Sequence, residues 1–219
     1  MALAVVDYGG GNLGSLVAAL ERRGARFEVT ADAARVAGAD GAIFPGDGAF
    51  GATMDALRSR GLDVAIRALV ERDRPFLGIC VGMQVLFESS TEFGGSQGLG
   101  ILPGVVSRFE DAPRVPHMGW NKLELLPPPC HPQERPQGAS RRTFTYGLTE
   151  NEYAYFLHSY RVPVGPATVA AATHGERFSA IVAQRNVMGT QFHPEKSRET
   201  GARLLDNFLN LTTTMETVS

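Results

Sequence analysis

Residues 76–85 read Phe-Leu-Gly-Ile-Cys-Val-Gly-Met-Gln-Val, and this stretch predicts a sharp corner between a strand and a helix. The apolar run at its start is typical of a buried strand, and the stretch passes into Leu86, Phe87 and Glu88, which favour a helix. Glycine stands two places before and two places after Cys80. This is the spacing of the Gly-x-Ser-x-Gly nucleophile elbow, with cysteine in place of serine.

Each part of this corner has a physical reason. The strand and helix backbones come close together at a sharp corner, so a side chain at Gly78 or Gly82 would collide. The Cys80 thiol is pushed outward, where a substrate can reach it and where the first amides of the helix favour thiolate over thiol. The alternative is that Cys80 is a small buried hydrophobe, which is common for a free cysteine. A catalytic interpretation therefore requires a base and an orienting group elsewhere in the chain.

Residues 187–195, Val-Met-Gly-Thr-Gln-Phe-His-Pro-Glu, contain both groups. A β-prone run leads to His193 at the expected carboxyl end of a strand, and Glu195 follows two residues later. In extended geometry these two side chains point to the same side, and Pro194 stiffens the link. The sequence therefore predicts a triad in which Cys80 attacks, His193 takes and returns a proton, and Glu195 fixes the imidazole tautomer.

A His-x-Glu pair also fits half of a metal site or a solvated turn. A zinc site needs further ligands. The other histidines are scattered along the sequence without ligand spacing: His117, His131, His158 and His174. Cys130 and His131 are adjacent, but four prolines surround them and no further ligand is near. Neither a metal nor a cofactor is predicted.

The composition limits the class of protein. A chain of 219 residues with 43% hydrophobic residues can form one sizeable core. The net charge of −2 gives no electrostatic reason to expect nucleic acid. Two cysteines cannot make a disulfide framework, and no apolar stretch approaches membrane length. Because the first residues also lack a signal-peptide pattern, the expectation is a soluble cytoplasmic protein.

Strands and helices alternate over the first 90 residues, which predicts an α/β fold with a mostly parallel central sheet and flanking helices. Short strands dominate from residue 105 to 191 and predict a smaller antiparallel portion. A helix at 200–211 closes a single domain that spans residues 1–211. Residues 212–219 are expected to be a disordered tail, and the proline-rich segment 127–142 an exposed loop.

Two glycine-containing turns precede helices. The turn at residues 9–12 invites a phosphate-binding interpretation, but the Gly-x-Gly-x-x-Gly offset and a Lys-Ser/Thr pair are both missing. The second turn contains Gly46 and Gly48, which let the backbone point its amides at an anion. It is the candidate oxyanion hole, with the amide of Val81 as the second donor. An ordinary turn is the alternative.

Five segments beside the elbow carry a resemblance to a known family. The chain resembles class I glutamine amidotransferases over nearly its whole length, and among them it is similar to the glutaminase-subunit family of imidazole glycerol phosphate synthases, of histidine biosynthesis. The anthranilate synthase glutaminase is the alternative, but it usually has Pro-Gly-Pro-Gly in the oxyanion loop and histidine at the position of Met83. The segments are residues 7–12, 45–50, 116–121, 155–160 and 192–197.

The resemblance implies that Cys80 forms a γ-glutamyl thioester and that L-glutamine is the substrate, giving glutamate and ammonia. It assigns the amino-acid end of the substrate to Gln84, Ser159 and Tyr160. It also implies a heterodimer in which ammonia passes to a (β/α)8 barrel cyclase subunit, which makes imidazole glycerol phosphate and aminoimidazole carboxamide ribotide. By this resemblance the partner interface includes Asn12, Met118, Trp120 and Lys196. The segment 127–142 is longer than the connection expected in the family.

Other functions share parts of the pattern. A cysteine peptidase could have the same elbow, but it would not need the segments 118–121 and 196–197. A DJ-1-like thiol enzyme could share the elbow and the α/β fold, but such chains lack the His-Pro-Glu segment at residues 193–195. A non-catalytic scaffolding subunit would share everything except turnover, and the presence of all three triad residues disfavours it.

Overall fold

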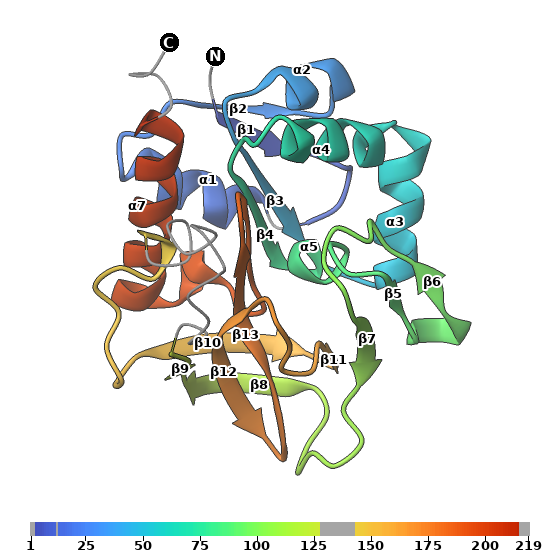
Figure 1. Cartoon of the computed structure of the whole chain (residues 1–219), viewed down its shortest axis with the longest axis vertical. Helices are drawn as coiled ribbons and strands as arrows, with labels where there is room; N and C mark the ends of the chain where they lie inside the picture. Colours follow the sequence, from blue (N-terminus) through green and yellow to red (C-terminus); the bar gives the residue numbers. More distant parts are fainter. Residues whose placement is uncertain (1–2, 12, 128–142, 215–219) are drawn as a thin grey trace, which may run out of the picture.

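The computed structural model describes residues 3–11, 13–127 and 143–214. An eight-stranded sheet with the order β2-β1-β3-β4-β14-β13-β12-β9 runs through the molecule (Figure 1). Its strands are β1 (Leu3–Val6), β2 (Phe27–Thr30), β3 (Ala42–Gly46), β4 (Phe76–Cys80), β9 (Glu124–Leu125), β12 (Thr168–His174), β13 (Glu176–Gln184) and β14 (Val187–Thr190).

The half of this sheet from β2 to β14 is parallel. Strands β1, β3, β4 and β14 are buried along their whole length, as expected for parallel strands covered on both faces. Figure 1 shows α1 and α7 on one side of the sheet and α3 and α4 on the other. The helices are α1 (Leu13–Glu21), α2 (Ala33–Gly38), α3 (Phe50–Ser59), α4 (Leu62–Glu71), α5 (Val81–Gln84) and α7 (Arg198–Thr214).

The other half, from β14 to β9, is antiparallel. A separate antiparallel pair, β8 (His117–Lys122) and β10 (Tyr153–His158), lies beside β12 at the lower end of Figure 1. A four-stranded sheet has the order β11-β7-β5-β6. Its strands are β5 (Ser89–Ser90), β6 (Ser96–Gln97), β7 (Val105–Arg108) and β11 (Tyr160–Arg161), and two short 3-10 helices are η1 (Glu92–Gly94) and η2 (Pro194–Lys196). The predicted fold class is therefore confirmed.

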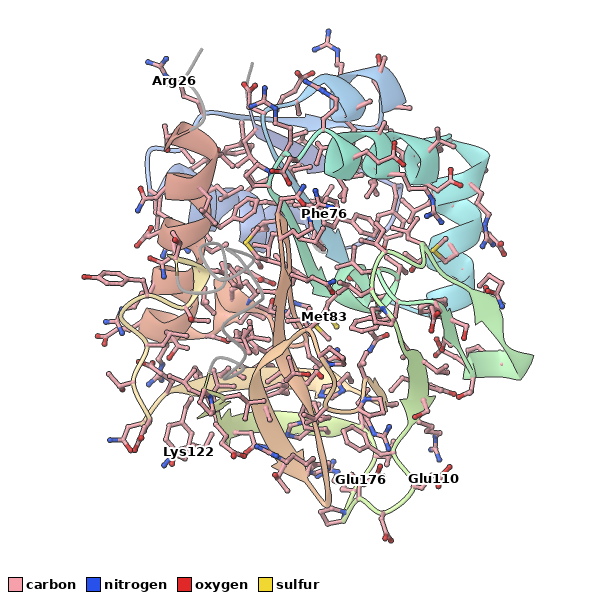
Figure 2. The ribbon with its side chains drawn as sticks, in the orientation of Figure 1. Arg26, Phe76, Met83, Glu110, Lys122 and Glu176 are labelled. Carbon is pink, nitrogen blue, oxygen red and sulfur yellow. The ribbon has the colours of Figure 1, made fainter. Side chains whose placement is uncertain are left out.

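The core is continuous across the parallel half of the sheet. Phe76 at the start of β4 and Met83 in α5 are fully buried and lie in the middle of the molecule (Figure 2). Burial of an aromatic or methionine side chain contributes roughly 1.5–3 kcal/mol. The core thus holds β4 and α5, the two elements on either side of the predicted elbow.

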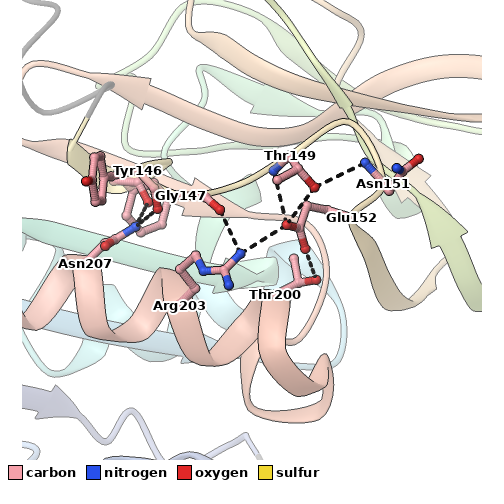
Figure 3. Close-up of polar contacts among 9 residues, drawn as sticks. Tyr146, Gly147, Thr149, Asn151, Glu152, Thr200, Arg203 and Asn207 are labelled. Atoms are coloured by element: carbon pink, nitrogen blue, oxygen red, sulfur yellow. Dashed lines mark hydrogen bonds and ion pairs between the residues drawn. The ribbon is translucent and has the colours of Figure 1, made fainter.

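A polar cluster joins α7 to the segment that leads into β10 (Figure 3). The carboxylate of Glu152 accepts hydrogen bonds from Thr149 and from Thr200 and Arg203 of α7. Asn207 of α7 donates to the backbone oxygens of residues 144 and 146. These contacts fix β10 against α7, which follows directly after the His-Pro-Glu segment.

Two predictions about local structure are wrong. Helix α7 continues to Thr214, so residues 212–214 are helical and not part of a disordered tail. The helix predicted at residues 86–88 is also absent, because α5 ends at Gln84 and the backbone oxygens of residues 85–88 accept from residues 98–102 instead of continuing a helix. In addition, the sequence pattern did not reveal strand β8, whose segment alternates polar and apolar residues only in part and begins after a proline. Asn12, Cys130, His131 and most of the segment 127–142 lie outside the described residues. Within the described residues, no helix is long and apolar enough to cross a membrane.

Candidate active site

The predicted elbow is present, and its backbone is strained. Cys80 ends β4 and has φ 57° and ψ −113°, a conformation that L-residues rarely adopt. A Cβ on Gly78 would lie 2.3 Å from the backbone oxygen of Gly82, and a Cβ on Gly82 would lie 2.1 Å from that of Phe44. The expected collisions at both glycines are therefore confirmed. Such strain is typical of functional sites, where the surrounding fold enforces it.

Strand register brings the His-Pro-Glu segment to the elbow. Strand β14 pairs in parallel with β4, with Thr190 beside Ile79. The chain therefore leaves β14 next to the point where β4 ends at Cys80. His193 and Glu195 follow there, and their Nδ1 and Oε1 atoms are 2.9 Å apart. The structure thus brings together the three residues of the predicted triad.

The link between His193 and Glu195 differs from the prediction. Residues 194–196 form the 3-10 helix η2, with His193 at its N-cap, so the segment is not extended. One turn of this helix folds the Glu195 carboxylate back onto the imidazole ring. Ser197 secures the turn, because its hydroxyl donates to the His193 backbone oxygen at 2.7 Å. Pro194 is suited to the first position of a helix, where no backbone N–H is needed.

The surroundings of His193 favour its protonated form. Burial lowers the pKa of His193, but hydrogen bonds and charge interactions with Cys80 and Glu195 raise it by more, to about 10. The Glu195 side chain is only 4% exposed, and within the described residues its Oε2 has no hydrogen-bond partner. A buried carboxylate that is held mainly by one imidazole strongly stabilises the imidazolium. His193 is therefore suited to hold and deliver a proton beside the thiol.

A cavity of about 330 Å³ opens in front of the elbow. Every residue predicted to hold the substrate's amino-acid end lines this cavity, namely Gln84, Ser159 and Tyr160. Cys80, Val81 and His193 also line it. The Cys80 sulfur lies 4.0 Å from the Leu157 backbone oxygen and 3.9 Å from Nε2 of Gln191. The thiol therefore faces a space that has polar groups around it.

The predicted oxyanion loop lies on the wall of this cavity. Gly48 lines it and has φ 90°, while within the described residues its amide makes no hydrogen bond. Tyr8 fixes the loop, because its hydroxyl donates to the Asp47 backbone oxygen at 2.9 Å. Gly46 is the last residue of β3, and a Cβ there would lie 2.5 Å from the Gly82 nitrogen. Gly46 is thus required for close packing against the elbow, and Gly48 is the better placed donor.

Three of the predicted interface residues, Met118, Trp120 and Lys196, are exposed. Met118 and Trp120 of β8 are 53% and 46% exposed, and Lys196 is exposed at the end of η2. Trp120 packs edge-on against Tyr155, and the Arg198 guanidinium lies 5.2 Å from its ring centre. The Tyr155 backbone oxygen in turn accepts from the His193 amide at 3.3 Å. Through Tyr155, the exposed Trp120 is therefore linked to the backbone of the candidate base, His193.

Sequence reasoning missed two features of the site. Glu92 of η1 lines the cavity, and its carboxylate accepts from the Phe50 amide at 2.6 Å. Nothing in the sequence around Glu92 marks it, because only the return of the chain after α5 places it there. His158 also lines the cavity, although its spacing from the other histidines did not mark it as a site residue. Within the described part of the chain, no group of three or more His, Cys, Asp or Glu side chains is arranged to hold a metal.

The fold and the site define a class of protein: an α/β enzyme with a cysteine at the nucleophile position of a strand-to-helix elbow and a His-Glu pair beside it. The family model "Glutamine amidotransferase class-I" matches residues 4–211. The protein named "Imidazole glycerol phosphate synthase subunit HisH" from Synechococcus sp. (strain JA-3-3Ab) is 47% identical over 212 residues, which cover 94% of this chain and 92% of that protein. The protein of the same name from Syntrophotalea carbinolica is 45% identical over 215 residues, covering 94% and 98%.

Solved structures share the fold at lower identity. A structure described as "Crystal structure of glutamine amidotransferase" has a TM-score of 0.71 and 22% identity, covering 97% of this chain and 100% of that one. The "Structure of PurLQS from Thermotoga maritima" has a TM-score of 0.69 and 21% identity, covering 96% and 99%. The chain belongs to the class I glutamine amidotransferases and, within them, to the family of the imidazole glycerol phosphate synthase subunit HisH.

Proposed function

We propose that this protein is the glutaminase subunit of imidazole glycerol phosphate synthase and that it hydrolyses L-glutamine to glutamate and ammonia. The observation that carries this proposal is the Cys80 thiol on a strained elbow, facing the cavity that His193, Gln84 and Tyr160 also line. The relatives named HisH support the particular subunit, at 45–47% identity over nearly the whole chain. They favour it over the anthranilate synthase glutaminase.

Cys80 is the nucleophile and His193 the proton carrier. The sulfur attacks the side-chain amide carbon of glutamine and forms a tetrahedral intermediate with a negatively charged oxygen. When the C–N bond breaks, the protonated imidazole of His193 gives its proton to the leaving nitrogen, which departs as ammonia. Water then attacks the carbonyl carbon of the remaining γ-glutamyl thioester and gives a proton to His193. The carbon–sulfur bond breaks, glutamate is released, and the Cys80 thiolate is restored beside the protonated imidazole.

The backbone amides near the elbow stabilise the charged oxygen. Gly48 and Val81 both line the cavity beside the thiol, and Val81 is the first residue of α5. Donors that already point at the developing charge are often the largest single contribution to catalysis. Tyr8 helps to keep the loop at Gly48 in place through Asp47.

The substrate's α-ammonium and α-carboxylate groups require opposite partners. Glu92 supplies a carboxylate on the cavity wall, which suits the ammonium group. Gln84 donates both hydrogens of its Nε2 to protein acceptors, namely the Tyr160 backbone oxygen at 2.9 Å and Gln191 at 3.0 Å. Its Oε1 therefore remains as an acceptor for the same ammonium group. The hydroxyl of Ser159 is a donor for the carboxylate.

The chain acts as a subunit of a complex, and the exposed face of β8 and β10 is the surface for the partner. Met118, Trp120 and Leu157 are large apolar residues that are 53%, 46% and 41% exposed on this face. Exposed apolar side chains that cluster beside a functional site mark interaction surfaces. The partner is a (β/α)8 barrel cyclase, which receives ammonia from the cavity and makes imidazole glycerol phosphate and aminoimidazole carboxamide ribotide.

The test separates the two half-reactions. In the complex with its cyclase subunit, Cys80→Ala removes glutamine-dependent product formation and leaves formation from ammonium salt intact, because the thiol serves only the release of ammonia. Cys130→Ala, which also removes a thiol, is the matched control and keeps both activities. If Cys80→Ala lost the ammonium-dependent reaction as well, or kept the glutamine-dependent one, the proposed division of labour would be wrong.

A further inference from the structure

Three histidines that are far apart in the sequence meet in one cluster, in which His117 and His158 are buried and His174 is half-buried. His117 begins β8, His158 ends β10 and His174 ends β12. The register of the β8–β10 pair places His117 directly opposite His158, and the ring of His117 stacks on that of His174 at 4.2 Å. His158 is 7% exposed and His117 is 4% exposed. The triad uses none of these residues, although His158 lines the catalytic cavity.

The hydrogen bonds of His158 fix its tautomer. Its Nδ1 lies 2.8 Å from the Tyr160 backbone oxygen, which can only accept, so Nδ1 carries the hydrogen. In a neutral ring the other nitrogen, Nε2, is then an acceptor. That atom lies 3.1 Å from Nδ1 of His117. The Nδ1 atom of His117 must therefore be the donor, and its own Nε2 must be an acceptor.

The opposite end of the chain of contacts leads to the same assignment. Asn121 Nδ2 lies 2.9 Å from the Thr173 backbone oxygen, which identifies it as the amide nitrogen. Its second hydrogen faces His117 Nε2 at 3.3 Å, so that nitrogen accepts. His117 thus carries its hydrogen on Nδ1 when judged from either side. The hydrogen bonds run in one direction, from Asn121 through His117 and His158 to the Tyr160 oxygen.

This series of hydrogen bonds ends at the candidate substrate site. The Tyr160 oxygen that accepts from His158 also accepts from Gln84 Nε2 at 2.9 Å. The second hydrogen of Gln84 Nε2 goes to Gln191, whose own amide nitrogen lies 3.9 Å from the Cys80 sulfur. Since Nε2 of Gln84 is held on both sides, the side chain cannot turn over. His158 and Gln84 are therefore linked through the Tyr160 backbone oxygen, to which both donate a hydrogen bond.

We propose that His117 and His158 are positioning residues for glutamine hydrolysis, forming a one-way hydrogen-bond chain that keeps the Gln84 amide oxygen available to the substrate's α-ammonium group. This inference rests on the proposed glutaminase activity. The hydrogen-bond chain exists only while both rings are neutral, because a hydrogen on Nε2 of His158 would face the Nδ1–H of His117. Burial, with a smaller contribution from His174, lowers the pKa of His117 to about 4. Burial also lowers the pKa of His158, to about 3, although its bond to Tyr160 opposes this.

The first experiment measures KM and kcat for glutamine in the complex with the cyclase subunit. His117→Phe keeps an aromatic ring against Phe156 and His174 but removes the donor to His158. One lost hydrogen bond predicts a KM about 3- to 10-fold higher, with kcat within about twofold. His117→Asn restores a donor at the position of Nδ1 and brings KM back to within about twofold of wild type.

The matched control is His174→Phe. His174 belongs to the same stack and bonds to the Arg114 backbone oxygen at 2.6 Å, but it is not part of the chain to Gln84. Its replacement should leave KM unchanged. An unchanged KM in His117→Phe, an equal rise in His174→Phe, or no recovery in a folded His117→Asn would each overturn the inference. If the wild-type complex hydrolysed no glutamine at all, the proposed function would fail instead.

A second measurement needs no variant and no turnover. In protein labelled with ¹⁵N at histidine, NMR spectra at pH 7 distinguish the two neutral tautomers. The inference requires His117 and His158 both to carry hydrogen on Nδ1, which is the minor form of free histidine. An Nε2–H tautomer or a charged ring at either residue would refute the chain, even if His117→Phe failed to fold.

Discussion

Acid should destabilise this protein through His158, and the size of the effect follows from its environment. His158 is packed among Phe109, Phe156 and Phe178. Burial, together with the neighbouring His117, His174 and His193, lowers its pKa to about 3, while the bond to Tyr160 acts in the opposite direction. Unfolded histidine titrates near pH 6.5. Between about pH 3 and pH 6.5 the unfolded chain therefore binds a proton that the folded chain does not.

The sign of the effect follows from this difference. Stability rises with pH wherever the unfolded state binds more protons, so the contribution of His158 is complete above pH 6.5 and is lost as the pH falls. Between pH 8 and pH 5 the free energy of unfolding should decrease by about 2 kcal/mol on account of His158 alone. His117 acts in the same direction. His193 acts in the opposite direction, because its raised pKa makes its contribution largest at low pH.

A comparison of two proteins isolates the contribution of His158. Urea unfolding of wild type and His158→Asn is measured at pH 8 and pH 5. Asparagine keeps a donor for the Tyr160 oxygen but does not titrate. Wild type should lose about 2 kcal/mol more than His158→Asn between the two pH values, since the contribution of His193 is common to both. If the two proteins lost the same free energy, His158 would titrate normally in the fold and the argument from burial would be refuted.

Two further predictions concern turnover and coupling in the complex. Gly48→Val should lower kcat roughly 10²- to 10³-fold with a smaller change in KM. Valine cannot keep φ 90°, so the loop amide would turn away from the oxyanion. If only KM changed, the loop would be part of the pocket wall and not a donor to the oxyanion. Lys196→Ala should keep basal glutaminase activity but reduce its stimulation by cyclase substrate, because one charge is lost from the partner surface. The control is Arg35→Ala on the distant helix α2, which also removes one positive charge and should leave the stimulation unchanged. Equal stimulation in wild type and Lys196→Ala would show that Lys196 is a solvated surface residue.

Short-range chemistry made part of the site predictable. The elbow could be inferred because the local corner brings the Gly78 and Gly82 backbones so close together that only glycine fits at residue 78. At Gly82 the close approach is to Phe44 of β3 and therefore depends on the fold. The contact between His193 and Glu195 could likewise be predicted, because the two residues are only two positions apart in the sequence. The geometry of that link was nevertheless predicted wrongly, since the 3-10 helix η2 depends on tertiary contacts such as the bond from the Tyr155 amide to Ser197. Local spacing fixes which groups can meet, but not the backbone path between them.

Residue type and spacing along short segments were enough to predict the alternating α/β pattern, the candidate nucleophile Cys80, and its candidate partners His193 and Glu195. Which distant groups surround these residues depends on how the strands pair and pack in the folded chain. Glu92 reaches the cavity and His158 reaches His117 through strand register and chain return, which no local pattern encodes. His117, His158 and His174 looked scattered because they are at least 16 residues apart along the chain, whereas β8, β10 and β12 lie side by side in the fold. Their tautomers, and hence their link to Gln84, follow from acceptors that only this packing supplies.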